Sequence, residues 1–285
     1  MNNQIEDEHI IEALGMSQIT IKNGEITKIT EPKIDYCPLF NKKRNIKTIT
    51  KEEIKENIEF RIKDFGMCTK NRSFEIKDLL TVGISEILKT NVAEGNLDCV
   101  VGVCEGVGTL LLTDPDLIQG VGGRVSGLVK TTPILEIIDK LDEKNILDPK
   151  TAEINQIKGV KKAIKEGYKN IAVTVVSPKD VQEINKIRNE TKSNIYILVA
   201  HTSTTTIENA ELLFENADII TACASKNVIK LAEEKQVYHY GKSVPIYAIT
   251  ENGRKLLDTR LEFLGKNKST NNYPIKDFNP AKPLI

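Results

Sequence analysis

The pattern of apolar and polar positions changes about one third of the way along the chain. Before residue 95, apolar residues either alternate with polar ones or recur every three to four positions, which predicts a β-hairpin followed by helices. From residue 97 onward, short continuous apolar runs alternate with amphipathic segments. Such runs are typical of strands that are buried on both faces of a parallel sheet. The two patterns predict two structural regions of different kinds.

The hairpin is predicted around a turn dipeptide. Residues 18–30 alternate apolar and polar on both sides of Asn23-Gly24, which tolerates the positive φ angles of a two-residue turn. Residues 31–48 contain two prolines and show no period, so we expect an irregular connection there.

Two helices are predicted to follow this connection. Thr50 and Glu53 form a capping box, and an apolar stripe then runs to Gly66, a residue that favours a helix end. This pattern predicts a helix over residues 51–65. A second apolar stripe predicts another helix, which ends near Asn91.

The second region predicts an α/β fold. Five apolar runs are separated by amphipathic stretches, at residues 97–103, 171–176, 195–200, 218–222 and 245–249. We expect a Rossmann-like or flavodoxin-like, mostly parallel sheet with helices on both faces, beside the N-terminal β-hairpin and helices. A long glycine-rich loop is predicted over 102–127. The predicted division is an N-terminal hairpin and helical region (1–95), an α/β sandwich domain (96–265) and an extended C-terminal tail (266–285).

Charge and cysteine content narrow the classes of partner. Forty basic residues balance forty acidic ones, so no net charge favours nucleic acid or an anionic membrane as a partner. The N-terminus is acidic and polar, unlike a signal peptide, and no apolar run reaches the ~18 residues of a membrane span. We therefore expect a cytoplasmic protein.

Its five cysteines are odd in number and lack a CxxC pair, which favours reduced thiols.

Reactive side chains follow the predicted strands. Because ligands bind beyond the carboxyl ends of parallel strands, these positions are candidate site residues. The candidate catalytic residues are Cys104, Glu105, His201 and Cys223. A thiol at a strand-to-helix turn can be activated by the helix N-terminus, and a histidine can transfer protons near neutral pH. Equally, small buried residues are common at such turns, and His201 can simply hydrogen-bond a neighbouring loop.

A second group of residues is predicted to bind a ligand. The glycine-rich segment reads GVCEGVGT and then GVGGRVSG, which matches neither a phosphate loop nor a dinucleotide fingerprint. Glycines nevertheless allow close approach of backbone to ligand, and an arginine pairs with carboxylate or phosphate. Alternatively the glycines only shape a tight loop, and the serines only cap helices. The candidates are Gly106, Gly108, Thr109, Gly122, Gly123, Arg124, Ser177, Thr202 and Ser225.

Four cysteines outside the predicted strands are candidate metal ligands. Cys37, Cys68, Cys104 and Cys223 can in principle gather around zinc or an iron–sulfur cluster. Their spacing contains no close pair of the kind that metal sites usually have.

Five segments carry a resemblance to a known family. They read YCPLF (36–40), FGMCT (65–69), VGVCEGVGT (101–109), GVGGRVSG (120–127) and ADIITACAS (217–225). Together they resemble the methanogenesis marker protein 8 family of methane-producing archaea, from about residue 10 to residue 265. The resemblance implies a role connected with methanogenesis but supplies no reaction, cofactor or catalytic residue. An anaerobic setting favours the metal and redox interpretations.

Two functional hypotheses follow. The first is an accessory or maturation factor that binds a cofactor, a metal centre or a partner, such as a methanogenic enzyme or its assembly complex, through the cysteine-lined sheet edge. The second is a small-molecule enzyme that uses Cys104 and Cys223 as acid/base or nucleophilic thiols, similar to two-cysteine racemases. The neighbours of these thiols, Glu105 and Ala224, depart from the sequences found in those racemases. A pure scaffold leaves the polar strand ends unexplained.

Overall fold

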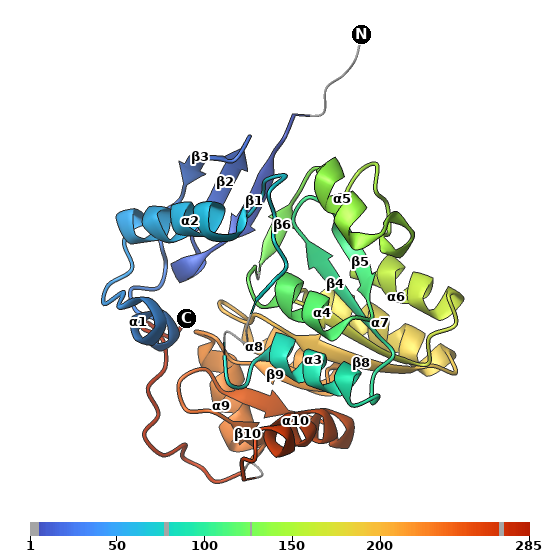
Figure 1. The fold of residues 1–285 in the computed structure, drawn as a ribbon. Coiled ribbons are helices and arrows are strands. Elements are labelled where there is room, and N and C mark those ends of the chain that lie inside the picture. Colours follow the sequence, from blue (N-terminus) through green and yellow to red (C-terminus); the bar gives the residue numbers. More distant parts are fainter. Residues whose placement is uncertain (1–5, 77–79, 126, 268–270) are drawn as a thin grey trace.

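Two β-sheets of unequal size form the framework of the molecule (Figure 1). The structure is a computed structural model that describes residues 6–76, 80–125, 127–267 and 271–285. The smaller sheet is antiparallel and has the strand order β3-β2-β1-β6, whereas the larger has the order β10-β11-β9-β8-β7-β4-β5. Among the described residues no helix is long and apolar enough to cross a membrane.

The small sheet contains the predicted hairpin. Its strands are β1 (His9–Glu12), β2 (Gln18–Lys22), β3 (Glu25–Ile29) and β6 (Leu128–Lys130). Asn23 and Gly24 have φ angles of +51° and +77°, as a two-residue hairpin turn with two positive φ angles requires, so the hairpin prediction is confirmed. The fourth strand, β6, pairs with β1 although it lies about 120 residues further along the chain.

Three helices accompany this sheet and the start of the larger one: α1 (Pro38–Arg44), α2 (Lys51–Phe65) and α3 (Ile84–Ala93). The prediction for α2 is confirmed, since Thr50 accepts a hydrogen bond from the Glu53 N–H and Gly66 ends the helix at φ +74°. The expectation of an irregular connection over 31–48 is wrong in part. Its proline at position 38 begins α1, because proline fits the first turn of a helix.

The larger sheet is parallel at its centre. Its strands are β4 (Cys99–Cys104), β5 (Gly108–Leu112), β7 (Asn170–Val175), β8 (Asn194–Val199), β9 (Ile219–Thr221), β10 (Tyr238–Tyr240) and β11 (Ile246–Ala248). Strands β4, β7, β8 and β9 run parallel to one another. At one edge β5 pairs antiparallel with β4, and at the other edge β11 pairs antiparallel with both β9 and β10. The last predicted strand therefore runs opposite to β9. Only residues 241–245 join β10 to β11, which is too short for a crossover.

Helices cover both faces of the larger sheet, as predicted. They are α4 (Pro115–Gly122), α5 (Leu135–Leu141), α6 (Gln156–Lys165), α7 (Pro178–Glu190), α8 (Ile207–Asn216), α9 (Lys226–Glu234) and α10 (Glu251–Phe263). Ile171 and Val173 of β7 pack into a core with α6 to α9, whereas Ala172 between them faces a core with α3, α4, α5 and α10. This alternation is that of a strand buried on both sides.

The prediction of a long glycine-rich loop over 102–127 is wrong. This segment contains the β4–β5 hairpin and the helix α4. Gly106 and Gly108 take φ angles of +79° and +75° in the turn, and a Cβ atom on Gly108 would lie 2.3 Å from the carbonyl carbon of Ala152. The glycines are required by this turn and by close packing.

The tail returns to the start of the chain. The Lys282 N–H donates to the Tyr36 carbonyl at 2.9 Å, and the Ile285 N–H donates to Ala224 at 2.8 Å, so the end of the tail lies beside α1 (Figure 1). Residues 268–270 of the predicted tail lie outside the described residues. A third apolar core, under the small sheet, includes Val125 and Ala224 from the predicted sandwich domain.

Candidate functional site

His201 and Cys223 lie side by side at the carboxyl end of the parallel strands. Strands β8 and β9 are paired with Val199 opposite Ile220, so continuing the same register by two residues puts His201 beside Ala222. Cys223 is the next residue along. The half-buried thiol of Cys223 therefore belongs to the same strand-end position as the imidazole of His201.

Hydroxyl groups hold these two loops together. The Thr202 hydroxyl donates to the Thr221 carbonyl at 2.8 Å, and the Ala224 N–H donates to the Ser203 hydroxyl at 3.3 Å. These two contacts flank Cys223 on either side. The hydroxyl-rich run after His201 thus fixes the distance between the imidazole and thiol loops.

Glu12 completes the arrangement from the other sheet. It is the last residue of β1, and its carboxylate binds the Nε2 atom of His201. The side chains of His201 and Glu12 are 25% and 26% exposed, so the pair remains accessible to small molecules. With Nε2 occupied, Nδ1 is the ring nitrogen available to the Cys223 thiol.

The electrostatics of the site favour a charged imidazole. Burial lowers the pKa of His201, but hydrogen bonds to Cys223 and Glu12 outweigh this effect and raise that pKa to about 10. A charged imidazole beside a thiol can donate a proton to the leaving group of a substrate that the sulfur attacks. The order cysteine–histidine–carboxylate is that of thiol enzymes in which the acid orients the base.

A second thiol lies near this site. Cys37 precedes α1 and is half-buried. Burial raises the pKa of the Cys37 thiol; backbone N–H groups of Phe40 and Leu39 partly oppose this effect, and the nearby Cys223 adds to it. Of the predicted metal ligands, the structure therefore brings Cys37 and Cys223 into one neighbourhood.

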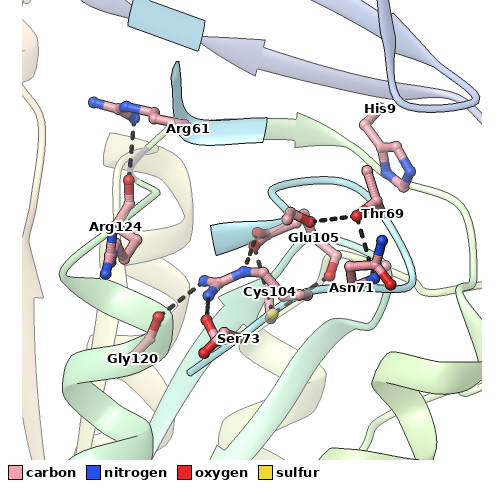
Figure 2. A network of polar contacts seen from close by, with 12 residues as sticks. His9, Arg61, Thr69, Asn71, Ser73, Cys104, Glu105, Gly120 and Arg124 are labelled. Atoms are coloured by element: carbon pink, nitrogen blue, oxygen red, sulfur yellow. Dashed lines mark hydrogen bonds and ion pairs between the residues drawn. The ribbon is translucent and has the colours of Figure 1, made fainter. Parts of the chain in front are cut away.

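The other predicted catalytic pair, Cys104 and Glu105, lies in a closed network (Figure 2). The Glu105 carboxylate accepts from the Arg72 Nε–H at 2.5 Å, and both side chains have zero exposure. Arg72 also donates to the carbonyls of Ser73 and Gly120. The network fastens the loop after α2 to the β4–β5 hairpin and to α4.

The thiols of this network are shielded from solvent. Cys104 and Cys68 are 1% and 0% exposed. Burial, together with the neighbouring Glu105 charge, raises the pKa of both thiols, which makes them poor nucleophiles. His9, which is also fully buried, bonds Thr131 at 2.7 Å.

The topology separates Cys104 from Cys223. Strands β7 and β8 lie between β4 and β9, and three strand spacings amount to about 14 Å. A two-thiol acid/base mechanism needs both sulfurs near one carbon atom, so this arrangement argues against the racemase-like pairing. Within the described part of the chain, no group of three or more His, Cys, Asp or Glu residues is arranged to hold a metal ion. Cys37, Cys68, Cys104 and Cys223 are all described, and they form no such group.

The predicted ligand-binding residues make contacts within the fold. Ser177 and Ser225 cap α7 and α9, and the Thr109 hydroxyl accepts from the Asn155 N–H at 2.7 Å. Arg124 pairs with Asp64 at 2.8 Å. Gly106 and Gly108 lie in the β4–β5 turn, and Gly122 and Gly123 lie at the end of α4.

Comparison with known proteins assigns the chain to a protein family. Residues 9–262 match a family described as uncharacterized proteins conserved in archaea (DUF2099). The chain belongs to this family. It is 44% identical over 283 residues to the uncharacterized protein MJ0054 of Methanocaldococcus jannaschii, an alignment that covers 98% of this chain and all of the relative. The name methanogenesis marker protein 8 is not part of these matches.

Sequence reasoning missed two residues that matter to the geometry. Glu12 lies 189 positions from His201, and Arg72 lies 33 positions from Glu105. For Glu12 the signal was weak: it ends the short apolar stretch at residues 10–11, and its role depends on a contact between two sheets. For Arg72 there was no local signal.

Proposed function

We propose that this chain is a thiol-dependent enzyme whose nucleophile is Cys223. The observation that carries the proposal is the contact of His201 with Glu12 on one side and Cys223 on the other. The carboxylate orients the imidazole, and the charged imidazole can donate a proton to the leaving group. Partial exposure of Cys223 gives a substrate access that the buried Cys104 lacks.

The reaction class that suits this arrangement is acyl transfer. The Cys223 sulfur attacks the carbonyl carbon of an ester or thioester, and the carbon–sulfur bond forms as the bond to the leaving group breaks. His201 donates its proton to the leaving group. Water or an acceptor amine or thiol then releases the acyl group, and His201 recovers a proton from it.

An acylation assay tests this function. Mixing the protein with p-nitrophenyl acetate or a short-chain thioester is expected to add one acyl group on Cys223, measured by intact and peptide mass. The adduct disappears in Cys223→Ser and forms about 10²-fold more slowly in His201→Gln. Cys104→Ser, which alters only a buried thiol, serves as the control and should label normally. Acylation that is unchanged in Cys223→Ser contradicts the proposal.

A role connected with methanogenesis remains the second candidate. It is favoured by a relative from Methanocaldococcus jannaschii, a methane-producing archaeon, and by the sequence resemblance described above. In that case Cys223 would receive a cofactor fragment or a partner of a methanogenic assembly rather than a metabolite. Recovery from an archaeal extract of a covalent adduct on Cys223, absent from Cys223→Ser, would support this role; recovery of unmodified protein alone would count against it.

A further inference from the structure

Three arginines converge where α1, α2 and the segment after α4 meet. Arg44 ends α1, Arg61 lies in α2, and Arg124 follows α4. The Arg61 guanidinium donates to the Arg124 carbonyl at 3.1 Å (Figure 2). We call these three residues the arginine cluster.

Each arginine of the cluster is stacked on a phenylalanine ring. The guanidinium carbon lies 3.9 Å from the ring centre for Arg44 over Phe60, 6.0 Å for Arg61 over Phe40 and 4.4 Å for Arg124 over Phe65. Two of these contacts are reciprocal, since α1 and α2 each supply an arginine to the other's ring. A guanidinium that lies over an aromatic face is attracted to the ring and still presents N–H donors to an acceptor.

The cluster carries more positive than negative charge. Asp64 pairs with Arg124 at 2.8 Å, but among the described residues no carboxylate lies within ion-pair distance of Arg44 or Arg61. Burial, and then the charges of Arg44 and Arg124, lower the pKa of Arg61 to about 10, against a smaller attraction from Glu105. That carboxylate is already held by another arginine.

The cluster also has unused donors. The Nε atom of Arg124 is buried and has no hydrogen-bond partner among the residues that the structure describes. In the described part of the chain, the Arg61 guanidinium donates one hydrogen bond, to a backbone carbonyl. Like charges held together with unmet donors are costly unless an anion balances them.

We propose that the arginine cluster binds a small, multiply charged oxyanion. Stacked guanidinium groups present paired N–H donors, which match the oxygen pairs of a phosphate or carboxylate. Two unpaired cations and a partly satisfied third one suit a ligand with at least two negative charges, such as a phosphate ester or a polycarboxylate. This site does not depend on the thiol chemistry of Cys223.

The test uses thermal unfolding of the full chain at constant ionic strength. Pyrophosphate and citrate are the probes for the two oxyanion classes, and sodium chloride sets the ionic baseline. We expect at least one probe to raise the unfolding midpoint with saturation, because it binds the folded state. Arg61→Gln and Arg44→Gln should each weaken that binding about tenfold or more, as loss of a charged hydrogen bond does. A response to pyrophosphate alone assigns a phosphate ligand, and a response to citrate alone assigns a polycarboxylate.

A matched control distinguishes this site from general charge effects. Arg254 is also stacked on an aromatic ring, 4.4 Å from the centre of Tyr238, but lies in α10 outside the cluster. Arg254→Gln should keep the full response. The proposal is overturned if neither probe exceeds the sodium chloride baseline, or if Arg61→Gln and Arg44→Gln respond as the unaltered protein does. At low salt and with no probe present, Arg44→Gln should be at least as stable as the parent, because it removes charge repulsion between Arg44 and Arg61.

Discussion

Burial divides the cysteines of this chain into two chemical groups. Cys68 and Cys104 are buried, and their pKa values are raised. Cys223 is partly exposed and lies beside a charged imidazole. From sequence Cys104 and Cys223 look alike, because both follow a strand; the difference arises from packing around each strand end.

The contacts of His201 with Cys223 and Glu12 predict a pH-dependent contribution to stability. The pKa of His201 is about 10 in the folded chain against an ordinary 6.5. Because the folded value is the higher one, the contribution is fully present below pH 6.5 and is lost as pH rises through about 10. Glu12→Gln should therefore cost about 1–2 kcal/mol near pH 6 and little at pH 10.5. Urea unfolding at several pH values measures this; a cost that grows with pH is the contrary outcome.

The buried ion pair of Arg72 and Glu105 predicts a large loss of stability when one partner is removed. Glu105→Gln leaves the Arg72 charge uncompensated in a site with zero exposure, so it should lower the free energy of unfolding by about 3–5 kcal/mol. Glu153→Gln, which removes a solvent-exposed pair with Lys158, is the matched control and should have little effect. Equal urea midpoints for the two variants would show that the buried pair does not contribute in this way.

At the level of elements, local signals were sufficient where the contacts are local. The capping box of α2 and the turn of the β2–β3 hairpin depend on neighbouring residues, and the apolar runs of β7 and β8 were long enough to recognise. Strand β6 has three residues and pairs across the chain, so no local pattern could indicate it. The glycines before and within α4 suggested a loop, although they are needed for close packing.

The β4–β5 turn predicts a contrast between two glycines. Gly108 and Gly95 have similar φ angles, +75° and +73°. A Cβ on Gly108 would meet the Ala152 backbone, whereas no atom of the described residues would lie within 4 Å of a Cβ on Gly95. Gly95→Ala should cost about 1 kcal/mol for backbone strain alone. Gly108→Ala should cost clearly more, because the backbone of Ala152 must move. Similar unfolding midpoints for both variants would contradict the tight packing of this turn.

At the scale of the whole molecule, the candidate site exists only where the two sheets meet. Glu12 comes from the small sheet, and His201 and Cys223 come from the larger one. The strand ends carrying the latter two could be predicted from the sequence, because parallel strands place their carboxyl ends at one edge. Their third partner could not, since it depends on how separate sheets pack.

This arrangement predicts that the two regions fold together. A fragment of residues 96–285 leaves β6 without β1 and exposes the core around Val125 and Ala224. We expect this fragment to unfold with a broad transition. Its free energy of unfolding should depend less steeply on urea concentration than its length requires. Cooperative unfolding of the fragment, with the slope expected for its size, would show instead that residues 96–285 form an independent domain.

Site-resolved alkylation of the native chain tests whether Cys223 is a nucleophile that His201 activates. Iodoacetamide is added at pH 7, and the modification rate of each of the five cysteines is followed by peptide mass. We expect Cys223 to react first, and His201→Gln to slow its reaction about tenfold or more. Cys68 and Cys104 should react only after unfolding. A Cys223 that reacts no faster than Cys104, or at a rate independent of His201, would contradict this expectation.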